Sequence, residues 1–485
     1  MTAAGETLAN LYRGGPADAI VLAEDGGRVS HERLAELVDD VARHLSGQGI
    51  GRGDRVALVI PEEPDLVPLL LGVAALGAAA APLNPAYTRE EFAFYFDDLR
   101  PAALIVAAGD CAAAREAAAD SMRVIEANGG ALDGPTADYE DAEPDDIALL
   151  LHTSGTTSRP KQVPLRHRNL TASARSIAAF YRLGADDVSF RAMPLFHVHG
   201  LVASTLASLS VGGSVVIPKR VLPRRLWGQL VEHGATWISA GPTLHSMALE
   251  RRGQDQRAPD TLRFVRSCSS ALAPELLARC EEAYGAPMLE AYGMTEASHQ
   301  MTSNPLPPAA HVATSVGVSA GAQIRTVDEA GRDVAVGEVV IRGPGVMSGY
   351  LANDEANAVA FVDGWFRTGD RGRIEDGYLY LEGRIKELII RGGENISPGE
   401  IEDALKAHGS VVDAVAFGIA SEKYGEEVGA AVALRETVDE KALQAHCRDR
   451  LAAFKVPVAI FVLPEIPRTA TGKVQRRRIA ERILG

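Results

Sequence analysis

The stretch Leu151–Leu165, LHTSGTTSRPKQVPL, places three threonines, two serines, one glycine and one lysine between Thr153 and Lys161. It follows the apolar run DDIALLLH, and Pro160 argues against a helix interior. A Ser/Thr/Gly loop after a strand presents backbone N–H groups and hydroxyls at one point, and Lys161 adds a cation. This pattern favours a polyphosphate ligand, although the Walker A spacing GxxxxGK[ST] is absent and a polar surface turn is the alternative.

Outward from this loop, helical patterns alternate with short apolar strands. Residues 30–50, SHERLAELVDDVARHLSGQGI, have apolar side chains at helical spacing, with Ser30 as N-cap and Gly47 as the break. The runs DRVALVI, AALIVAA, GSVVIP, TWISAG and LRFVRS are typical of buried strands. Such alternation predicts βαβ units and mainly parallel sheets.

The pattern changes near residue 315, where glycine turns and short alternating strands predict an antiparallel β unit. After GRIKE comes a compact α+β segment, with the domain boundary placed at Arg384–Lys386. The predicted class is α/β. Residues 1–384 would form a large N-terminal domain of layered α/β subdomains plus the β unit, and residues 385–485 a small, mobile α+β domain.

Composition narrows the class of protein. The 485 residues amount to about three domain-sized units. A hydrophobic content of 46% with 23% charged residues is that of a soluble globular protein. The net charge of −15, from 64 acidic and 49 basic residues, disfavours nucleic acid and anionic membranes as partners.

Cysteine usage and hydropathy predict a cytoplasmic protein. The four cysteines show no CxxC spacing and no histidine cluster, which disfavours disulfides and zinc. The first residues lack the apolar segment of a signal peptide. The uncharged run 66–83 is long enough to raise the question of a membrane span, but it contains Pro68, Gly72, Gly77 and Pro82. A buried helix followed by a short strand explains this run better.

Six motifs occur in order: LHTSGTTSRPKQV, MPLFHVHGL, LEAYGMTEA, GWFRTGD, GRIKELIIRGGENISPGEIE and PRTATGKVQRR. Together they resemble the adenylate-forming family of acyl-CoA synthetases, non-ribosomal adenylation domains and firefly-type luciferases, over essentially the whole chain. The resemblance implies an enzyme that joins a carboxylate to the α-phosphate of ATP, releases pyrophosphate, and then lets a thiol displace AMP. ATP, Mg²⁺ and coenzyme A are the implied cofactors and cosubstrate, and the partner is a small carboxylic acid.

The resemblance also implies roles for single residues. Thr153 and Glu296 would be the Mg²⁺ partners, because a hard cation prefers oxygen ligands. Lys473, on a Gly-flanked loop, would stabilise charge on the forming acyl–phosphate oxygens. The resemblance also implies that His197 is a catalytic residue. Asp370 would accept hydrogen bonds from the ribose hydroxyls. The implied nucleotide-binding residues are Thr153, Ser154, Gly155, Thr156, Thr157, Lys161, Ser270, Ala271, Glu290, Tyr292, Gly293, Met294, Thr295, Asp370, Arg384 and Lys473.

For the second half-reaction, Lys386 takes the family's hinge position, where the small domain rotates. Gly392 and Gly393, which lack a Cβ, would let the thin pantetheine arm approach, with Glu394 beside them. The arginines at 476–478 are either ligands of the CoA phosphates or an exposed basic face. One departure concerns Gln162, where the family usually has glycine. If that position needs a positive φ, glutamine would strain the backbone; if it needs only close packing, glutamine would reshape the loop.

The acyl pocket is expected near FHVHGL, RSCSS and MTEASHQM. These segments supply the polar candidates His199, Arg266, Ser269 and His299, whereas a fatty-acid tunnel would be apolar. A small diacid needs donors for its second carboxylate. Arg266 at a solvent-facing strand end and His299 as a loop histidine are the alternative readings.

At a finer scale, the chain resembles the oxalate–CoA ligase subgroup in LHTSGTTSRPK, PLFHVHGL, RFVRSCSSALAPELL, YGMTEASHQMTSNPLPP and FGIASEKYGEE, and Ser158 in place of the commoner glycine fits that subgroup. The resulting hypothesis is formation of oxalyl-CoA, AMP and pyrophosphate. A malonate or short- to medium-chain fatty acid ligase is the runner-up, and a catalytically lapsed nucleotide or acyl-CoA sensor is the alternative of another class. Oligomeric state is left open.

Overall fold

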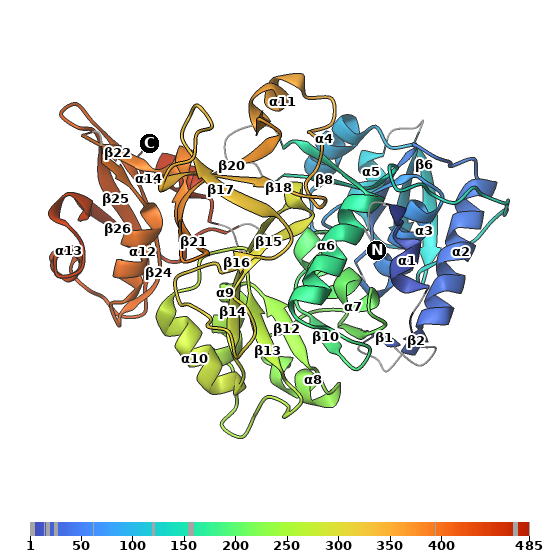
Figure 1. Cartoon of the computed structure of the whole chain (residues 1–485), viewed down its shortest axis with the longest axis horizontal. Coiled ribbons are helices and arrows are strands. Elements are labelled where there is room, and N and C mark those ends of the chain that lie inside the picture. The colour runs from blue at the N-terminus through green and yellow to red at the C-terminus, as the bar shows by residue number, and fades with distance from the viewer. Residues whose placement is uncertain are drawn as a thin grey trace.

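The computed structural model shows three layered sheet units followed by a small C-terminal domain (Figure 1). In the described part of the chain there are a nine-stranded sheet, a seven-stranded sheet and two five-stranded sheets. The predicted α/β class with a large N-terminal and a small C-terminal domain is therefore confirmed. The structure describes residues 5–13, 15, 20–23, 28–61, 63–118, 122–153, 160–392, 394–468 and 474–484.

The seven-stranded sheet forms the first unit, in the strand order β7-β6-β5-β3-β4-β8-β9. Its central pairs are parallel, as the βαβ pattern predicts. The run 66–83 forms a buried helix and a short strand, and among the described residues no helix is long and apolar enough to cross a membrane. The bounds are β3 Arg55–Val59, α3 Glu63–Ala75, β4 Ala79–Pro82, α4 Arg89–Leu99, β5 Ala103–Ala107, α5 Ala112–Ala117, β6 Arg123–Asn128, β7 Ala131–Leu132, β8 Ile147–His152 and β9 Gln162–Arg166.

The nine-stranded sheet forms the second unit, in the order β16-β15-β14-β13-β12-β10-β11-β1-β2. The neighbours from β14 to β1 are parallel, and both ends of the sheet are antiparallel. Ser30 caps α2 by accepting from the Arg33 amide, and the helix ends at Gly47 as predicted. The bounds are α1 Ala9–Tyr12, β1 Ile20–Ala23, β2 Arg28–Ser30, α2 His31–Gly47, α6 His167–Phe180, β10 Val188–Arg191, η2 His199–Leu206, α7 Ala207–Leu209, β11 Ser214–Ile217, α8 Leu226–Glu232, β12 Trp237–Ala240, α9 Pro242–Glu250, β13 Phe264–Ser267, α10 Pro274–Tyr284, β14 Met288–Met294, η3 Thr295–Ala297, β15 His299–Ser303 and β16 Val318–Ser319.

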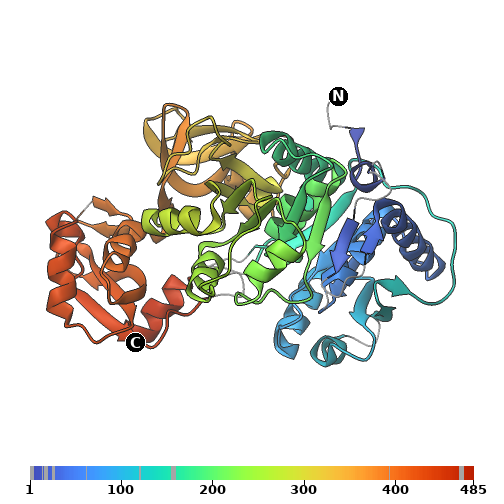
Figure 2. The ribbon, with the colours of Figure 1, turned by 90° about the horizontal axis from the view of Figure 1, so that it is seen from below.

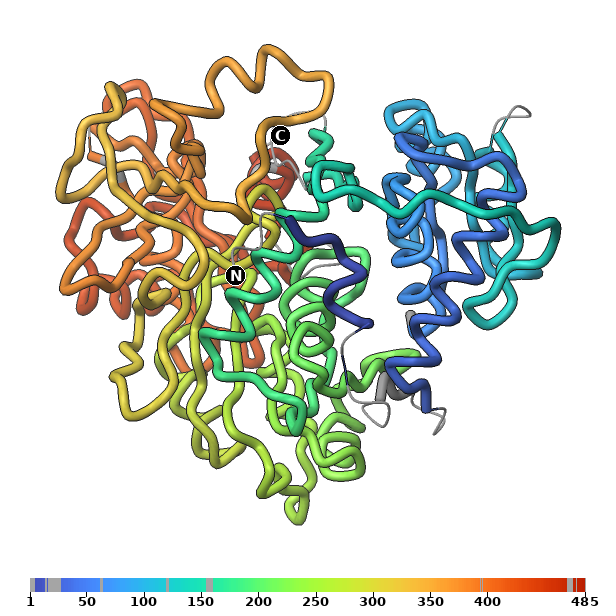
Figure 3. Tube along the Cα trace, turned by 45° about the vertical axis from the view of Figure 1, so that its right-hand side comes forward, coloured from blue at the N-terminus to red at the C-terminus, as the bar shows by residue number. Residues whose placement is uncertain are grey.

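The predicted antiparallel unit is the five-stranded sheet β17-β18-β20-β19, with β21 paired to β20. Figure 3 shows this unit, in yellow to orange, mainly at the left and the first unit, in blue, at the right. The bounds are β17 Gln323–Val327, β18 Val336–Arg342, α11 Asp354–Ala360, β19 Phe361–Val362, β20 Trp365–Glu375 and β21 Tyr378–Arg384.

The small domain lies at one end of the molecule (Figure 2) and has hydrophobic clusters of its own on both faces of its sheet. Strand β21 ends at Arg384, and a short 3-10 helix, η4, follows it as the linker. The domain boundary between residues 384 and 385 stays a prediction. The bounds are η4 Ile385–Glu387, β22 Ile389–Arg391, β23 Glu394–Ile396, α12 Pro398–Lys406, β24 Val411–Ser421, β25 Gly425–Leu434, α13 Glu440–Arg448, η5 Ala453–Lys455, β26 Ala459–Leu463 and α14 Arg476–Leu484.

Candidate active site

The two ends of the predicted phosphate loop hold each other. The Thr153 amide donates to the Lys161 carbonyl at 2.9 Å, and the Lys161 amide donates to Thr153 Oγ1 at 3.1 Å. These contacts extend the antiparallel pairing of β8 with β9. The ends of the loop are thus fixed at one edge of the sheet. Ser154, Gly155, Thr156, Thr157 and Ser158 lie outside the described residues.

Lys161 and Glu296, distant in sequence, meet around one tyrosine. Lys161 Nζ lies 4.5 Å from the centroid of the Tyr350 ring, and the Tyr350 hydroxyl donates to Glu296 Oε1 at 2.9 Å. The Met347 amide donates a hydrogen bond to the Glu296 carbonyl at 2.8 Å, and the Glu296 side chain is buried. A buried carboxylate beside a lysine is a setting that fits a magnesium ion carried by a polyphosphate.

Within the described ranges, no group of three or more His, Cys, Asp or Glu side chains could hold a metal by itself. Mg²⁺ is usually bound through one or two carboxylates together with substrate phosphates and water. Glu296 and Thr153 remain the protein partners that the resemblance implies for this ion, which would neutralise phosphate charge.

Gln162 is not strained. It opens β9 in extended conformation opposite His152 and is absent from the residues with positive φ. Its Nε2 donates to the Asp98 carbonyl and to Asp98 Oδ2, both at 2.7 Å. His152 Nε2 contacts the same carboxylate at 2.9 Å. The backbone here does not need a positive φ, and the Gln162 side chain ties the end of the loop to α4.

The predicted ribose ligand, Asp370, lies buried on β20 between two partners. Arg384 Nε is 2.7 Å from Oδ1, and the Tyr292 hydroxyl donates to Oδ2. Burial and the nearby carboxylate raise the pKa of Tyr292 well above its usual value, so its phenol remains a donor. The Thr368 hydroxyl accepts from the Asp370 amide at 3.1 Å. An ionised acceptor of fixed orientation fits two ribose hydroxyls.

Two of the segments implied to bind the nucleotide, residues 270–271 and 290–295, meet at Glu290. Its Oε1 accepts from the Leu272 amide at 3.1 Å, directly after the exposed residues Ser270 and Ala271. Burial raises the pKa of Glu290 to about 8, so its carboxyl is protonated at neutral pH and can donate. Met294 and Thr295, both partly buried, end β14 and begin η3.

Arg266 is the centre of a buried polar cluster in the predicted acyl pocket. It projects from β13 and is 0% exposed, so its interpretation as a solvent-facing strand end was wrong. Its Nη2 lies 2.9 Å from His299 Nε2, and its Nη1 lies 3.2 Å from His199 Nε2. In the described part of the chain, no acidic side chain forms an ion pair with this guanidinium. The further partners are Tyr181 Oη at 2.9 Å, Ser239 Oγ at 2.8 Å and Gln300 Oε1 at 3.0 Å.

Arg266 also decides which ring nitrogen of each histidine carries the proton. Burial, followed by the arginine charge, holds the pKa of His199 and of His299 well below the usual value, so both rings are neutral. A guanidinium only donates, so each Nε2 accepts and each Nδ1 carries the proton. His199 Nδ1 then donates to Ser269 Oγ at 2.9 Å. Among the described residues no group accepts from His299 Nδ1, which is left as a donor for a ligand.

The backbone at the predicted acid-binding residues is strained. Ser269 has φ 78° and His299 has φ 109°, values that side chains with a Cβ rarely adopt. Ser298, before His299, has φ 52°. A Cβ on Gly293 would lie 2.1 Å from the His299 carbonyl oxygen, so only glycine fits there. Such strain is retained where a site must be held in one shape.

The segment after MPLF forms a π-helix, η2, from His199 to Leu206. Its first residue is His199, and His197 lies just before it with its ring 4.7 Å from that of Phe196. A Cβ on Gly200 would meet the Met193 carbonyl oxygen at 2.2 Å, so the chain is close-packed at this turn. Short π-helical turns are frequent at functional sites.

The residues predicted for the second half-reaction lie in the small domain and its linker. Lys386 is exposed in η4, and Gly392, with φ 61°, donates its amide to the Tyr424 carbonyl at 2.7 Å. Glu394 is exposed, whereas Gly393 and the predicted catalytic Lys473 lie outside the described residues. Arg476 is neither a free CoA ligand nor part of an exposed face, because all three of its side-chain nitrogens bind groups within the small domain and linker.

Several residues of the site carried no sequence signal. Tyr350 lies in a glycine-rich loop, and Asp98 lies at the end of an ordinary amphipathic helix. Tyr181, Ser239 and Gln300 come from three separate elements and meet only in the folded chain. Their contacts are long-range, so spacing along the sequence could not indicate them.

Comparison with known proteins agrees with this geometry. The family described as AMP-binding enzyme matches residues 11–351, and its C-terminal domain matches residues 400–473. Oxalate–CoA ligase of Arabidopsis thaliana is 45% identical over 485 residues, covering 94% of this chain and 94% of that protein. Oxalate–CoA ligase of Saccharomyces cerevisiae is 37% identical over 512 residues, covering 96% and 94%.

A solved structure extends the likeness to three dimensions. O-succinylbenzoate coenzyme A synthetase from Bacillus subtilis, in complex with ATP and a magnesium ion, superposes with a TM-score of 0.87 at 28% identity. The match covers 98% of this chain and 99% of that one. The predicted enzyme class, an acid–thiol ligase, is thereby confirmed. This chain belongs to the AMP-binding enzyme family, the adenylate-forming family that its six motifs resemble.

Proposed function

We propose that this chain is an ATP-dependent oxalate–CoA ligase. Oxalate and ATP would give oxalyl-adenylate and pyrophosphate, and coenzyme A would then displace AMP to give oxalyl-CoA. ATP and Mg²⁺ accompany the related solved structure, and coenzyme A is named in the relatives' activities. The class of reaction rests on family membership, whereas the acid rests on the pocket.

The buried guanidinium of Arg266 is the observation that carries the choice of acid. A buried charge is costly unless it is paired, and the described residues supply no carboxylate for it. A substrate with a second carboxylate would bring the missing negative charge. Ser269 and His299 would contact that carboxylate, while Arg266 would act behind them. An acid with an apolar tail would leave these donors without acceptors, which costs affinity.

The remaining residues would divide the work of the first half-reaction. Thr153 and Lys161, with the loop between them, would hold the β- and γ-phosphates, and Glu296 would hold the magnesium ion. Asp370, supported by Arg384, would orient the ribose. Lys473 would approach the forming acyl–phosphate bond from the small domain, with Lys386 as hinge. Orientation and charge neutralisation would supply most of the catalysis, because phosphoryl transfer needs little covalent assistance from the protein.

The test is AMP release from purified protein with Mg-ATP and coenzyme A, across oxalate, malonate, acetate, octanoate and 4-coumarate. We expect oxalate to exceed the monocarboxylates by at least tenfold in kcat/KM. Preference for octanoate or coumarate would retain the ligase reaction and refute the pocket assignment. Preference for malonate would favour the runner-up.

A different experiment tests the alternative of a sensor without turnover. A Lys473→Ala variant should lose at least a hundredfold in AMP release while still binding ATP, which equilibrium binding of a labelled nucleotide measures. If the unsubstituted chain binds ATP and releases no AMP with any acid, it is the sensor that we gave as the alternative.

A further inference from the structure

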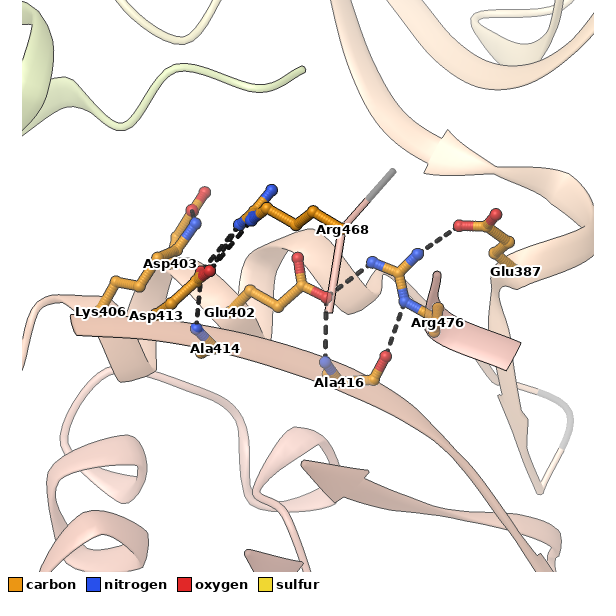
Figure 4. Close-up of polar contacts among 9 residues, drawn as sticks. All are labelled: Glu387, Glu402, Asp403, Lys406, Asp413, Ala414, Ala416, Arg468 and Arg476. Carbon is orange, nitrogen blue, oxygen red and sulfur yellow. Dashed lines mark hydrogen bonds and ion pairs between the residues drawn. The ribbon is translucent and has the colours of Figure 1, made fainter. Parts of the chain in front are cut away.

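Arg476 bridges three elements of the small domain and the linker (Figure 4). Its Nε donates to the Ala416 carbonyl on β24 at 2.7 Å, and its Nη2 lies 2.6 Å from Glu402 Oε1 on α12. Its Nη1 is paired with Glu387 Oε2 in η4. The side chains of Arg476 and Glu387 are only 17% and 22% exposed, so water screens this pair weakly.

The partner residue Glu402 is fixed in turn. Its Oε1 accepts from the Ala416 amide at 2.9 Å, so the carboxylate joins α12 to β24 as well as to Arg476. The guanidinium therefore sits on the rigid body of the small domain, through strand and helix, and reaches outward to one linker residue. Charge-assisted bonds of this kind are shorter and about twice as strong as neutral ones.

The linker is held on its other side as well. Arg384, the last residue of β21, pairs with the buried Asp370 of the large domain at 2.7 Å. Glu387, three positions later, is held by Arg476 of the small domain. Between these two ion pairs stand only Ile385 and Lys386, and both are exposed. The Leu388 amide donates to the Arg384 carbonyl at 3.1 Å across this turn.

We propose that Arg476 is a positioning residue that makes Glu387 part of the rigid small domain and so confines the linker's pivot to Ile385 and Lys386. A short pivot limits the orientations open to the small domain and raises the fraction of time that its catalytic residues face the nucleotide. This proposal rests on the proposed function only for its kinetic consequence, since the restraint itself is a property of the fold.

The test replaces Glu387 by glutamine, which keeps the size of the side chain and removes its charge. Arg476 retains Glu402 and Ala416 in this variant, so the small domain should stay folded. The control is Glu400→Gln, which removes the ion pair of Glu400 with Lys455 Nζ, 2.7 Å apart in the same domain and away from the linker. Glu387→Asp, which keeps the charge, is the conservative rescue.

Amide hydrogen exchange, followed by mass spectrometry, measures the restraint in a peptide covering residues 384–390. We expect exchange there to be about tenfold faster in Glu387→Gln, about the effect of losing one charge-assisted hydrogen bond. Glu400→Gln should match the unsubstituted chain, and Glu387→Asp should fall between them. Unchanged exchange in Glu387→Gln, or the same acceleration in Glu400→Gln, would overturn the proposal.

Steady-state kinetics measures the consequence. We expect kcat for CoA-ester formation to fall about tenfold in Glu387→Gln, with the KM values for ATP and oxalate within about twofold, because the predicted substrate ligands lie mainly in the large domain. A rise in KM with kcat unchanged would overturn the positioning role. If oxalate is not a substrate of the unsubstituted chain, the proposed function fails, and the exchange measurement still decides the restraint.

Discussion

Replacing Arg266 by methionine should reduce the preference for oxalate over acetate. Two hydrogen bonds and one imidazole ring separate the guanidinium from a carboxylate held at His299 Nδ1, a distance of about 8 Å. At an effective dielectric constant of about 20, two unit charges at this distance attract each other by about 2 kcal/mol. This energy corresponds to about a 30-fold change in a ratio of rate constants.

The assay is kcat/KM for oxalate and for acetate, measured from AMP release. The ratio of the two should fall about 30-fold in Arg266→Met, since acetate has no second carboxylate to lose its counter-charge. The matched control is Tyr181→Phe. It removes one acceptor of Arg266, 2.9 Å from Nε, and leaves the charge in place, so its ratio should stay within about threefold.

The comparison separates charge from damage to the fold. Met at 266 leaves His299 Nε2 without a donor and His199 Nε2 with only the Ser239 hydroxyl, so unfolding by urea should show a loss of several kcal/mol. Such a loss would lower the activity with both acids equally. An equal fall for oxalate and acetate would therefore refute the reasoning that Arg266 supplies the field for a second carboxylate.

Three further predictions concern other parts of the site. Asp370→Asn should raise the KM for ATP by about 10- to 100-fold, because a neutral amide accepts less well from the ribose and from Arg384; ATP titration with saturating oxalate measures it. Glu290 has a pKa raised from 4.5 to about 8 by burial, so the folded state keeps a proton that the unfolded chain releases. The free energy of unfolding should thus fall as pH rises from about 5 to 8, and urea titrations should show a smaller slope in Glu290→Gln. Gly293→Ala should destabilise the chain by about 1–3 kcal/mol and raise the KM for oxalate, because the new methyl group would displace the His299 backbone; an unchanged KM would contradict this.

Much of the fold followed from local patterns in the sequence. The helix from His31 to Gly47 has its cap, its apolar stripe and its terminating glycine within one short segment. The strands of the parallel sheets are short apolar runs, and their length and the turn residues on either side indicate a strand. The π-helix at His199 was not foreseen, because its distinction from an α-helix depends on how Gly200 packs against residues 193 and 194.

Residues of the site could be predicted from the sequence only where they lie within one of the six motifs. Asp370, Arg384 and Tyr292 come from three motifs, and the structure brings them together, although their roles stay proposals. The burial of Arg266 could not be predicted from sequence, because a charged residue at a strand end is more often exposed. The ion pair between Arg476 and Glu387 links positions far apart in the chain, and the sequence gives no pattern for it.

The most direct test of the central claim is a competition between acids. The purified chain would receive Mg-ATP, limiting coenzyme A and equimolar oxalate, malonate, acetate and octanoate, and mass spectrometry would identify the CoA esters formed. We predict that oxalyl-CoA makes up most of the product. Mainly acetyl-CoA, malonyl-CoA or octanoyl-CoA would contradict the claim that Arg266, His299 and Ser269 form a site for the second carboxylate of oxalate.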